Sequence, residues 1–391
     1  MKKIAVTIFA VILLCSLCSC TQKPNESMSE IDFTKLSWNK NTEQYEENSL
    51  KYFYKKSSDG KYAWIDRLEV KDEYKGDKLE FPDEINGSVL VRIGFDVGGV
   101  TENETNIPYN VFGSTLADDF KYPQKFKNIQ NIVLPDSIQA IEDGAFAGLY
   151  SMKNINCPKE LRRIGVGAFN LCSGITEFTI GEYVSEIGPG AFGNCERLRK
   201  IHVSANNKKF CEQGGFIVDK EQKQAILAVP GKEELVIPND VNSFRKKCFA
   251  TCKVKKLDLE SEESGLVKKG DFIYRKDNKA LLLGIVNGKT AIIPEGIEEL
   301  NQESILIGEK INKIEMPSGL KYLRGAWLDI VDADDCTYVF RSKNPPKIVE
   351  PSESTSKVPV GQNIVVPKQS FEKYEKWLKS NGGELNLLKT F

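Results

Sequence analysis

The sequence predicts an α/β repeat solenoid, because one phrase returns along the chain at a fixed interval. Phe146, Phe169 and Phe192 are 23 residues apart, and each of them ends the pattern Ile-x-x-Gly-Ala-Phe. Apolar residues keep the same interval at two further offsets, namely Ile129, Met152, Ile175 and Leu198, and Leu134, Cys157, Ile180 and Val203. A unit of this length cannot bury its own apolar side, so neighbouring units must stack.

Each unit begins with a short predicted strand. The first four lie at 129–134, 152–157, 175–180 and 198–203. Apolar and polar residues alternate at the end of each, as a pleated strand requires. Units of about 20 to 29 residues with this strand pattern are typical of leucine-rich repeats. We therefore expect a leucine-rich-repeat solenoid over 128–330, with a parallel concave sheet and the Phe side chains packed behind it.

A second interval, of 56 residues, relates the segment that begins at Phe216 to the one that begins at Phe272. Apolar runs flank a polar turn in both segments, which predicts β-hairpins inserted into the stack. A similar hairpin is expected from 52–54 and 62–65, because Asp59-Gly60 between them is a strong turn pair. We expect 49–127 to form a divergent first repeat or cap.

The last part of the chain, 331–391, is expected to be a capping segment. Ser304 and Ile305 replace the Ala-Phe of the regular phrase, so the repeat degenerates before this point. Residues 349–357 are polar and predict a loop. Tyr374, Trp377 and Leu378 fall on one helical face, which predicts a helix that ends before Gly382-Gly383.

These phrases carry a family resemblance. Ile-x-x-Gly-Ala-Phe-x-x-Cys, at 164–172 and 187–195, resembles the BspA-type leucine-rich repeat, and so does 214–230. The resemblance spans 50–330, and Asn344-Pro-Pro346 is similar to the closing segment that often follows such repeats. It implies a bacterial surface or secreted protein of the kind that binds host or neighbouring-cell macromolecules.

The amino terminus predicts export. Lys2-Lys3, an apolar run over 4–14 and Leu17-Cys-Ser-Cys20 together predict a signal peptide at 1–19, since the run is too short to span a bilayer. The last four residues resemble the bacterial lipobox, which implies a lipid on Cys20 and an envelope lipoprotein, exposed on the outer membrane. An unlipidated secreted protein is the alternative. Residues 20–48 are expected to be a flexible tether.

Composition excludes several functions. The chain has a formal net charge of −1, and it has no extended basic region of the kind that would indicate a nucleic-acid partner. No catalytic or cofactor motif is present, and the single histidine, His202, lies on a predicted strand without a marked partner. We therefore expect no enzyme, no cofactor and no metal site. Cys172, Cys195 and Cys252 share one repeat offset and predict a row of small buried side chains.

The predicted binding surface is the inner face of the sheet. Its outward positions gather seven polar or basic residues, namely Lys153, Asn154, Arg199, Lys200, His202, Lys255 and Lys256. Basic charge there favours an acidic protein or an anionic glycan, although the same charges serve solubility. The positions carry no aromatic side chain for sugar stacking, which favours adhesion to or recognition of an extracellular protein, host proteins included. A glycan-binding or structural lipoprotein is the alternative.

Overall fold

The fold is taken from a computed structural model of the chain. It describes residues 28–71, 73–94, 128–245, 248–249, 252–261, 264–301, 304–308, 311–324, 329–331, 336–349, 363–383 and 385–391. The predicted signal peptide at 1–19, the predicted lipidation site Cys20 and the part of the predicted first cap at 95–127 lie outside the described residues.

The turns of the solenoid stack through a row of short parallel strands, which we call the ladder strands. In chain order they are β4 (Lys78–Glu80), β7 (Asn131–Val133), β9 (Asn154–Ile155), β11 (Glu177–Ile180), β13 (Lys200–Val203), β17 (Glu234–Ile237), β19 (Lys256–Leu259), β23 (Thr290–Ile292), β26 (Lys313–Met316), β29 (Thr337–Phe340), β31 (Asn363–Val366) and β32 (Leu388–Thr390). They fall into four parallel sheets, β4-β7-β9, β11-β13, β17-β19 and β23-β26-β29-β31-β32. The predicted repeat strands are thereby confirmed, because β7, β9, β11 and β13 lie within them.

A second row of strands runs beside the first and contains the Ile of the repeated phrase. Its members are β6 (Ser88–Ile93), β8 (Ala140–Ile141), β10 (Arg163–Ile164), β12 (Glu186–Ile187), β18 (Ser243–Phe244), β24 (Glu299–Leu300), β27 (Tyr322–Arg324) and β30 (Lys347–Val349). β6, β8, β10 and β12 pair in parallel, so this row also joins successive turns, including those of β10 and β12, between which the ladder row is interrupted. A short strand, β5 (Glu84–Ile85), pairs with β6.

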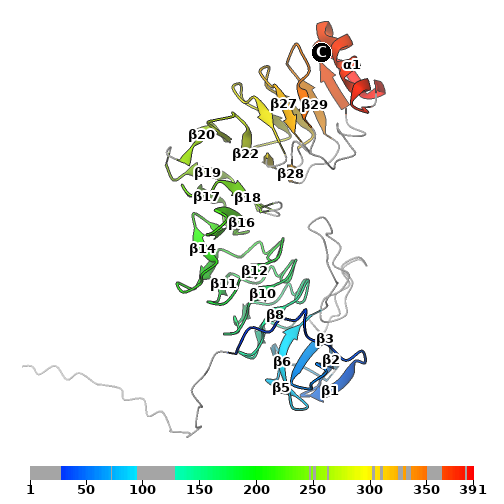
Figure 1. Ribbon diagram of the computed structural model, residues 1–391, viewed down its shortest axis with the longest axis vertical. Coiled ribbons are helices and arrows are strands. Elements are labelled where there is room, and N and C mark those ends of the chain that lie inside the picture. Colours follow the sequence, from blue (N-terminus) through cyan, green and yellow to red (C-terminus); the bar gives the residue numbers. More distant parts are fainter. Residues whose placement is uncertain are drawn as a thin grey trace, which may run out of the picture.

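The predicted hairpins are confirmed, but each is a meander of three antiparallel strands. The meanders are β1 (Glu43–Glu47), β2 (Leu50–Lys56) and β3 (Tyr62–Val70); β14 (Phe210–Gln213), β15 (Phe216–Asp219) and β16 (Gln224–Ala228); and β20 (Leu266–Lys269), β21 (Phe272–Arg275) and β22 (Leu281–Val286). The third strand of each pairs in parallel with the solenoid, through β6, β18 and β25 (Ile305–Gly308), which β28 (Asp329–Val331) follows. Figure 1 shows the stack bending in its middle, where β14 and β20 lie.

The tether predicted over 20–48 is too long. The carbonyl oxygen of Met28 accepts a hydrogen bond from Arg162 at 3.2 Å, and the N–H of Ile31 donates to Gln139 Oε1 at 2.8 Å. The rings of Trp38 and Trp64 meet edge to face at 5.5 Å, and β1 pairs with β2. Single apolar residues in a polar stretch anchor this segment, a signal too sparse to appear as a periodic pattern.

The solenoid also continues beyond residue 330, into the predicted capping segment. β29, β31 and β32 extend the last ladder sheet. The predicted helix is present as α1 (Phe371–Ser380), flanked by the short 3₁₀ helices η3 (Lys368–Ser370) and η4 (Leu385–Leu387). It buries Tyr374 and Leu378, and the ring of Tyr374 lies 5.5 Å from that of Phe340. Because α1 is the one α-helix among the described residues, the solenoid is built mainly from strands and turns.

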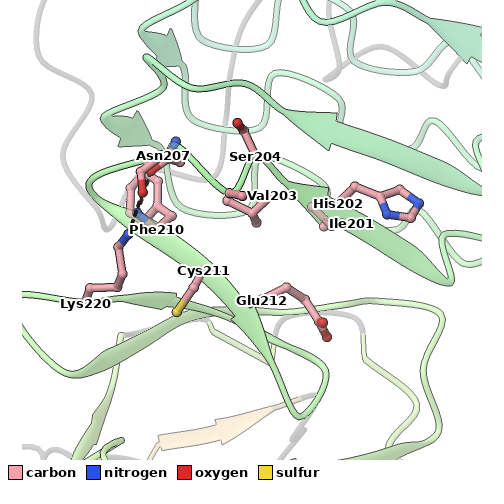
Figure 2. A pocket seen from close by; sticks show the side chains of 10 residues that line it. Ile201, His202, Val203, Ser204, Asn207, Phe210, Cys211, Glu212 and Lys220 are labelled. Atoms are coloured by element: carbon pink, nitrogen blue, oxygen red, sulfur yellow. Dashed lines mark hydrogen bonds between the residues drawn. The ribbon is translucent and has the colours of Figure 1, made fainter.

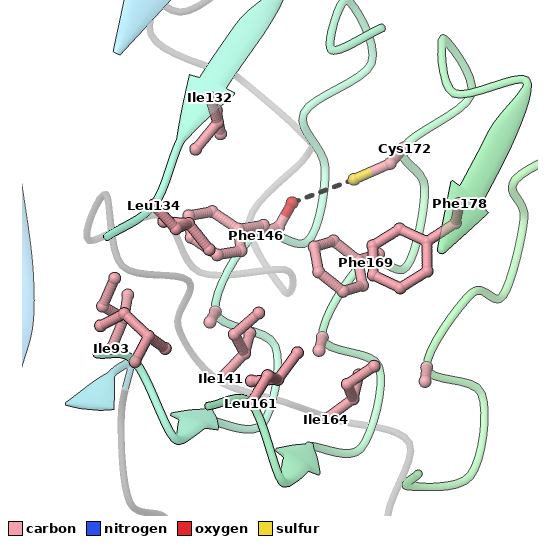
Figure 3. Packing of buried hydrophobic residues seen from close by; sticks show 14 of the residues in the cluster. Ile93, Ile132, Leu134, Ile141, Phe146, Leu161, Ile164, Phe169, Cys172 and Phe178 are labelled. Atoms are coloured by element: carbon pink, nitrogen blue, oxygen red, sulfur yellow. Dashed lines mark hydrogen bonds between the residues drawn. The ribbon is translucent and has the colours of Figure 1, made fainter. Parts of the chain in front are cut away.

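In the regular turns the core contains a stack of three phenylalanine rings, from Phe146, Phe169 and Phe192, and Figure 3 shows the first two. The ring of Phe169 lies 5.8 Å from that of Phe146 and 5.3 Å from that of Phe192, at interplanar angles of 12° and 14°. Phe178 packs against the ring of Phe169 at 5.2 Å. The glycine two residues before each stacked ring, as at Gly167 with a φ of +59°, takes the left-handed conformation that glycine favours.

We predict that Phe169→Ala lowers the free energy of unfolding by about 3 to 5 kcal/mol, because it removes a fully buried ring with neighbours on both sides. Urea unfolding of the two proteins measures the difference. Thr179→Ala, at an exposed position of β11, is the control and should change stability by less than about 0.5 kcal/mol. A loss below about 1 kcal/mol for Phe169→Ala would contradict the assigned core.

Candidate ligand-binding surface

The seven predicted binding residues all lie on ladder strands or directly before them, and all have exposed side chains. They are divided among three sheets. Lys153 and Asn154 belong to the β9 turn, Arg199, Lys200 and His202 to the β13 turn, and Lys255 and Lys256 to the β19 turn. The second meander, β14 to β16, separates the last two groups in the chain.

Acidic side chains on neighbouring strands neutralise part of this basic surface. Lys255 Nζ lies 2.9 Å from Glu233 Oε2, and Lys256 Nζ lies 3.1 Å from Asp258 Oδ2. The hydrogen bond to Asp258 raises the pKa of Lys256. His202 Nε2 lies 3.7 Å from Glu177 Oε2. The surface is therefore mixed in charge, because the parallel register places Glu177 opposite Lys200 and Glu234 opposite Lys256.

Apolar side chains are also exposed on this surface, and our sequence reasoning missed them. Val236 on β17 is 39% exposed, and Ile292 on β23 is 58% exposed. The two occupy the same position in units 56 residues apart. Strand alternation was the available signal, since the middle residue of Leu235-Val236-Ile237 must point away from the core.

Two clefts lie at equivalent places, each between a ladder strand and the first strand of the following meander. The cleft between β13 and β14, which we call the first cleft, has a volume of about 350 Å³ (Figure 2). Its lining residues are Ile201, His202, Val203, Ser204, Ala205, Asn207, Phe210, Cys211, Glu212 and Lys220. The second cleft, between β19 and β20, has a volume of about 310 Å³ and is lined by Asp258, Leu259, Ser261, Leu266, Val267, Lys268 and Lys276.

Asn207 holds the closed end of the first cleft. Its Nδ2 donates hydrogen bonds to the carbonyl oxygens of Gly181 and Val184 at 2.7 and 2.9 Å. Its Oδ1 accepts from the N–H of Phe210 at 2.7 Å, and its carbonyl oxygen accepts from Lys220 Nζ, as Figure 2 shows. These bonds fix the loop from β13 to β14.

The first cleft does not assemble an activated nucleophile. Burial raises the pKa of the Cys211 thiol, which disfavours the reactive thiolate. His202 is directed to Glu177 instead. Within the described residues, no cluster of three or more His, Cys, Asp or Glu side chains is placed to hold a metal ion. What the cleft offers chemically is backbone and polar side-chain hydrogen bonding.

The buried thiols link successive turns. Cys172 Sγ donates to the carbonyl oxygen of Phe146 and Cys195 Sγ to that of Phe169, both at 3.1 Å. Cys252 and Cys336 make the same kind of bond to the preceding turn. All seven cysteines in the described part of the chain are free. The row of buried cysteines predicted from the sequence is present, and each thiol in it is also a donor.

A family model of the BspA type leucine rich repeat region matches the chain in six copies, over residues 118–214 and 231–328. The chain belongs to the BspA-type leucine-rich repeat family. The gap between the two matched blocks coincides with strands β15 and β16 of the second meander. No curated protein matches the chain in sequence. Of the described helices, none has the length and apolar character needed to cross a membrane.

Three solved structures are similar to this BspA-type chain. A leucine rich cell surface protein from Faecalibacterium prausnitzii is 14% identical, with 89% of this chain and 94% of that chain covered and a TM-score of 0.42. The pneumococcal vaccine antigen PcpA is 16% identical, with 89% and 98% covered and a TM-score of 0.41. A leucine-rich repeat protein from Bacteroides ovatus is 15% identical, with 91% and 98% covered and a TM-score of 0.32.

We predict that the buried thiols make the protein less stable at alkaline pH. Burial raises the pKa of Cys195 from 9.0 to about 12. The unfolded thiol therefore ionises from about pH 9, while the folded thiol keeps its proton, so stability falls between about pH 9 and 12. Each such thiol contributes a slope of up to about 1.4 kcal/mol per pH unit.

Urea unfolding as a function of pH tests this prediction on Cys195→Ala beside the wild type. The variant should show a flatter decline above pH 9, because the contributions of Tyr and Lys are the same in both proteins. Cys211→Ala, which removes a half-buried thiol, should change the slope less. Parallel declines in wild type and Cys195→Ala would show that the Cys195 thiol is ionised in the fold.

Proposed function

We propose that this protein is a lipid-anchored surface protein of a bacterial envelope that recognises an extracellular protein. The recognition surface is the ladder face, which we define as the outward residues of β9, β11, β13, β17 and β19 with the residue before β9, β13 and β19. It comprises Lys153, Asn154, Glu177, Thr179, Arg199, Lys200, His202, Glu234, Val236, Lys255, Lys256 and Asp258. Binding through this surface, and not catalysis, is the proposed activity.

The observation that carries the proposal is the mixture of side chains on the ladder face. Protein interfaces combine apolar contact area with charged and polar groups around it. Val236 supplies exposed apolar surface, while Lys200 and Lys256 alternate with the acids opposite them. Within the described residues, Lys153 and Lys200 have no ion-pair partner, so their charges are available to an acidic partner.

A glycan partner is the second candidate, and it would use a different surface. Sugar rings stack on aromatic side chains, and the ladder face has none. Tyr150 and Tyr322, which are 39% and 37% exposed, lie outside the ladder strands. If replacement of Tyr150 and Tyr322 by Ala abolished binding while the ladder face was unchanged, the result would favour the hypothesis that the protein binds a glycan.

Anchoring would hold the solenoid close to the membrane. Eight Cα-to-Cα steps lead from Cys20 to Met28, which already contacts Arg162. A chain of that length reaches at most about 29 Å. With its lipid in the outer membrane and its ladder face exposed to the exterior, the solenoid would therefore meet partners near the cell surface.

We predict that Cys20→Ala abolishes lipid attachment and releases or mislocalises the protein, because the acylated thiol is then absent. Two or more acyl chains are needed for firm anchoring, so the change should be close to complete. Detergent partitioning and mass analysis of the amino terminus measure it. Cys18→Ala is the control and should leave anchoring intact. A wild-type amino terminus without lipid would refute the anchoring proposal.

We predict that Arg199→Glu/Lys200→Glu slows association with the partner by about tenfold at low salt, since charges of this kind steer encounter. Extracellular and host-surface proteins are first captured on the mature chain prepared without lipid. Binding should weaken with salt, because exposed charges are screened over about 8 to 10 Å at physiological ionic strength.

Lys379→Glu is the matched control for this test, because it reverses an exposed charge on α1, away from the ladder face. It should leave association unchanged. Circular dichroism establishes that all variants are folded. Equal association rates for the double variant and the wild type would remove the ladder face from the proposal.

A further inference from the structure

We propose that the first cleft binds an extended peptide segment of the protein partner, which adds as a strand to the free edge of β13. This inference rests on the proposed function and narrows it, because it assigns the partner a backbone contact at a strand edge beside the ladder face.

The edge of β13 that borders the cleft has unpaired backbone groups. Among the described strands β13 pairs only with β11, and the N–H of Ser204 donates to the carbonyl oxygen of Ile180 at 2.9 Å. In a parallel pair, alternate residues direct both backbone groups to the same neighbour. Lys200, His202 and Ser204 therefore face β11. The N–H and C=O groups of Ile201 and Val203 face the cleft.

The edge of β14 across the cleft is also open. β14 pairs with β15, and the N–H of Lys220 donates to the carbonyl oxygen of Lys209 at 3.0 Å. By the antiparallel alternation, Cys211 and Gln213 then face β15, while Phe210 and Glu212 face the cleft. Asn207 Oδ1 accepts the N–H of Phe210. Within the described residues, no backbone hydrogen bond joins β13 to β14.

Hydrogen bonds fix the chain at both ends of the cleft. Asn207 holds the loop end. At the other end, the N–H of Gly231 donates to the carbonyl oxygen of Leu198 at 2.8 Å, and that of Val236 to Gly214 at 2.9 Å. A strand edge with unpaired N–H and C=O groups is a ready template for another strand, and strand addition is an established mode of peptide recognition.

In the second cleft, which occupies the equivalent place, an ion pair bridges the two strands. There Lys268 Nζ forms an ion pair with Asp258 Oδ1, from β20 to β19 across the cleft. The equivalent residues of the first cleft are Glu212 and His202, and each is paired elsewhere. Glu212 Oε1 lies 3.4 Å from Lys232 Nζ, and His202 lies against Glu177. We therefore assign the peptide to the first cleft.

The side chains around the first cleft define the peptide. Val203, Ala205 and Cys211 are small and largely apolar, so they leave room for a backbone and for small apolar side chains. Because strand side chains alternate, every second peptide residue would point towards them. The predicted ligand is an extended segment with small apolar residues at alternate positions.

A display library of short unstructured peptides, panned on the mature full-length chain prepared without lipid, supplies the probe. Selected peptides should show the alternation. N-methylation of a single amide that pairs with β13 should weaken binding by about tenfold, and the same change at the next residue should have little effect. A library without binders, or binders whose N-methyl scan lacks a period of two, would overturn the inference.

Val203→Pro removes one N–H from the cleft edge while the bonds from β13 to β11 remain, as is tolerated for proline on an edge. It should weaken peptide binding by about tenfold. Val203→Thr keeps the N–H and the shape and is the matched control. If Val203→Pro does not fold, the test is alkylation of Cys211 in the Cys157→Ala variant, in which Cys157 cannot react. The Cys157→Ala/Cys211→Ala variant, treated with the same reagent, is the control. Loss of binding on alkylation supports the cleft, and unchanged binding overturns it.

The same variants separate this inference from the proposed function. A captured protein that loses affinity with Arg199→Glu/Lys200→Glu, but not with Val203→Pro, would leave the ladder face in place and overturn the cleft. Peptides that bind at the cleft while no extracellular protein depends on the ladder face would refute the proposed surface alone.

Discussion

The close approach of successive turns is the constraint on which the rest of this structure depends. A Cβ atom on Gly188 would lie 2.4 Å from the backbone nitrogen of Val166 in the preceding turn, so only glycine allows the spacing there. At this distance the rings of Phe169 and Phe192 stack, and the thiol of Cys195 reaches a carbonyl oxygen one turn away. The residues of the repeated phrase are therefore those that make the contacts between one turn and the next.

The meanders are the places where this constraint is relaxed, and they create the candidate binding features. Between β13 and β17 the inserted strands divide the ladder row into separate sheets. A strand that would otherwise pair on both sides then has a free edge. The ion pair of Lys268 and Asp258 closes one such place, whereas the side chains of Glu212 and His202 leave the other open.

The parts of the structure that the sequence predicts are those that repeat. The intervals of 23 and 56 residues locate the ladder strands, the meanders and the stacked rings, and the spacing of Tyr374 and Leu378 locates α1. The missed features depend on contacts between turns. Glu234 neutralises Lys256 because the strand register places them opposite each other, and Trp38 anchors the segment before β1. The first cleft exists because β13 and β14 do not pair with each other. None of these follows from a periodic pattern within one unit.

The same stacking explains how free cysteines are compatible with the export that we propose for this chain. The thiolate is the form that oxidises, and burial raises the pKa of Cys195 and Cys252 to about 12, so little thiolate exists at neutral pH. Each thiol also satisfies a carbonyl oxygen of the preceding turn. At residue 304 a serine does this instead, since its hydroxyl donates to the carbonyl oxygen of Leu281 at 2.7 Å. The requirement at these places is therefore a small buried donor, and contact between turns stabilises the solenoid without a disulfide.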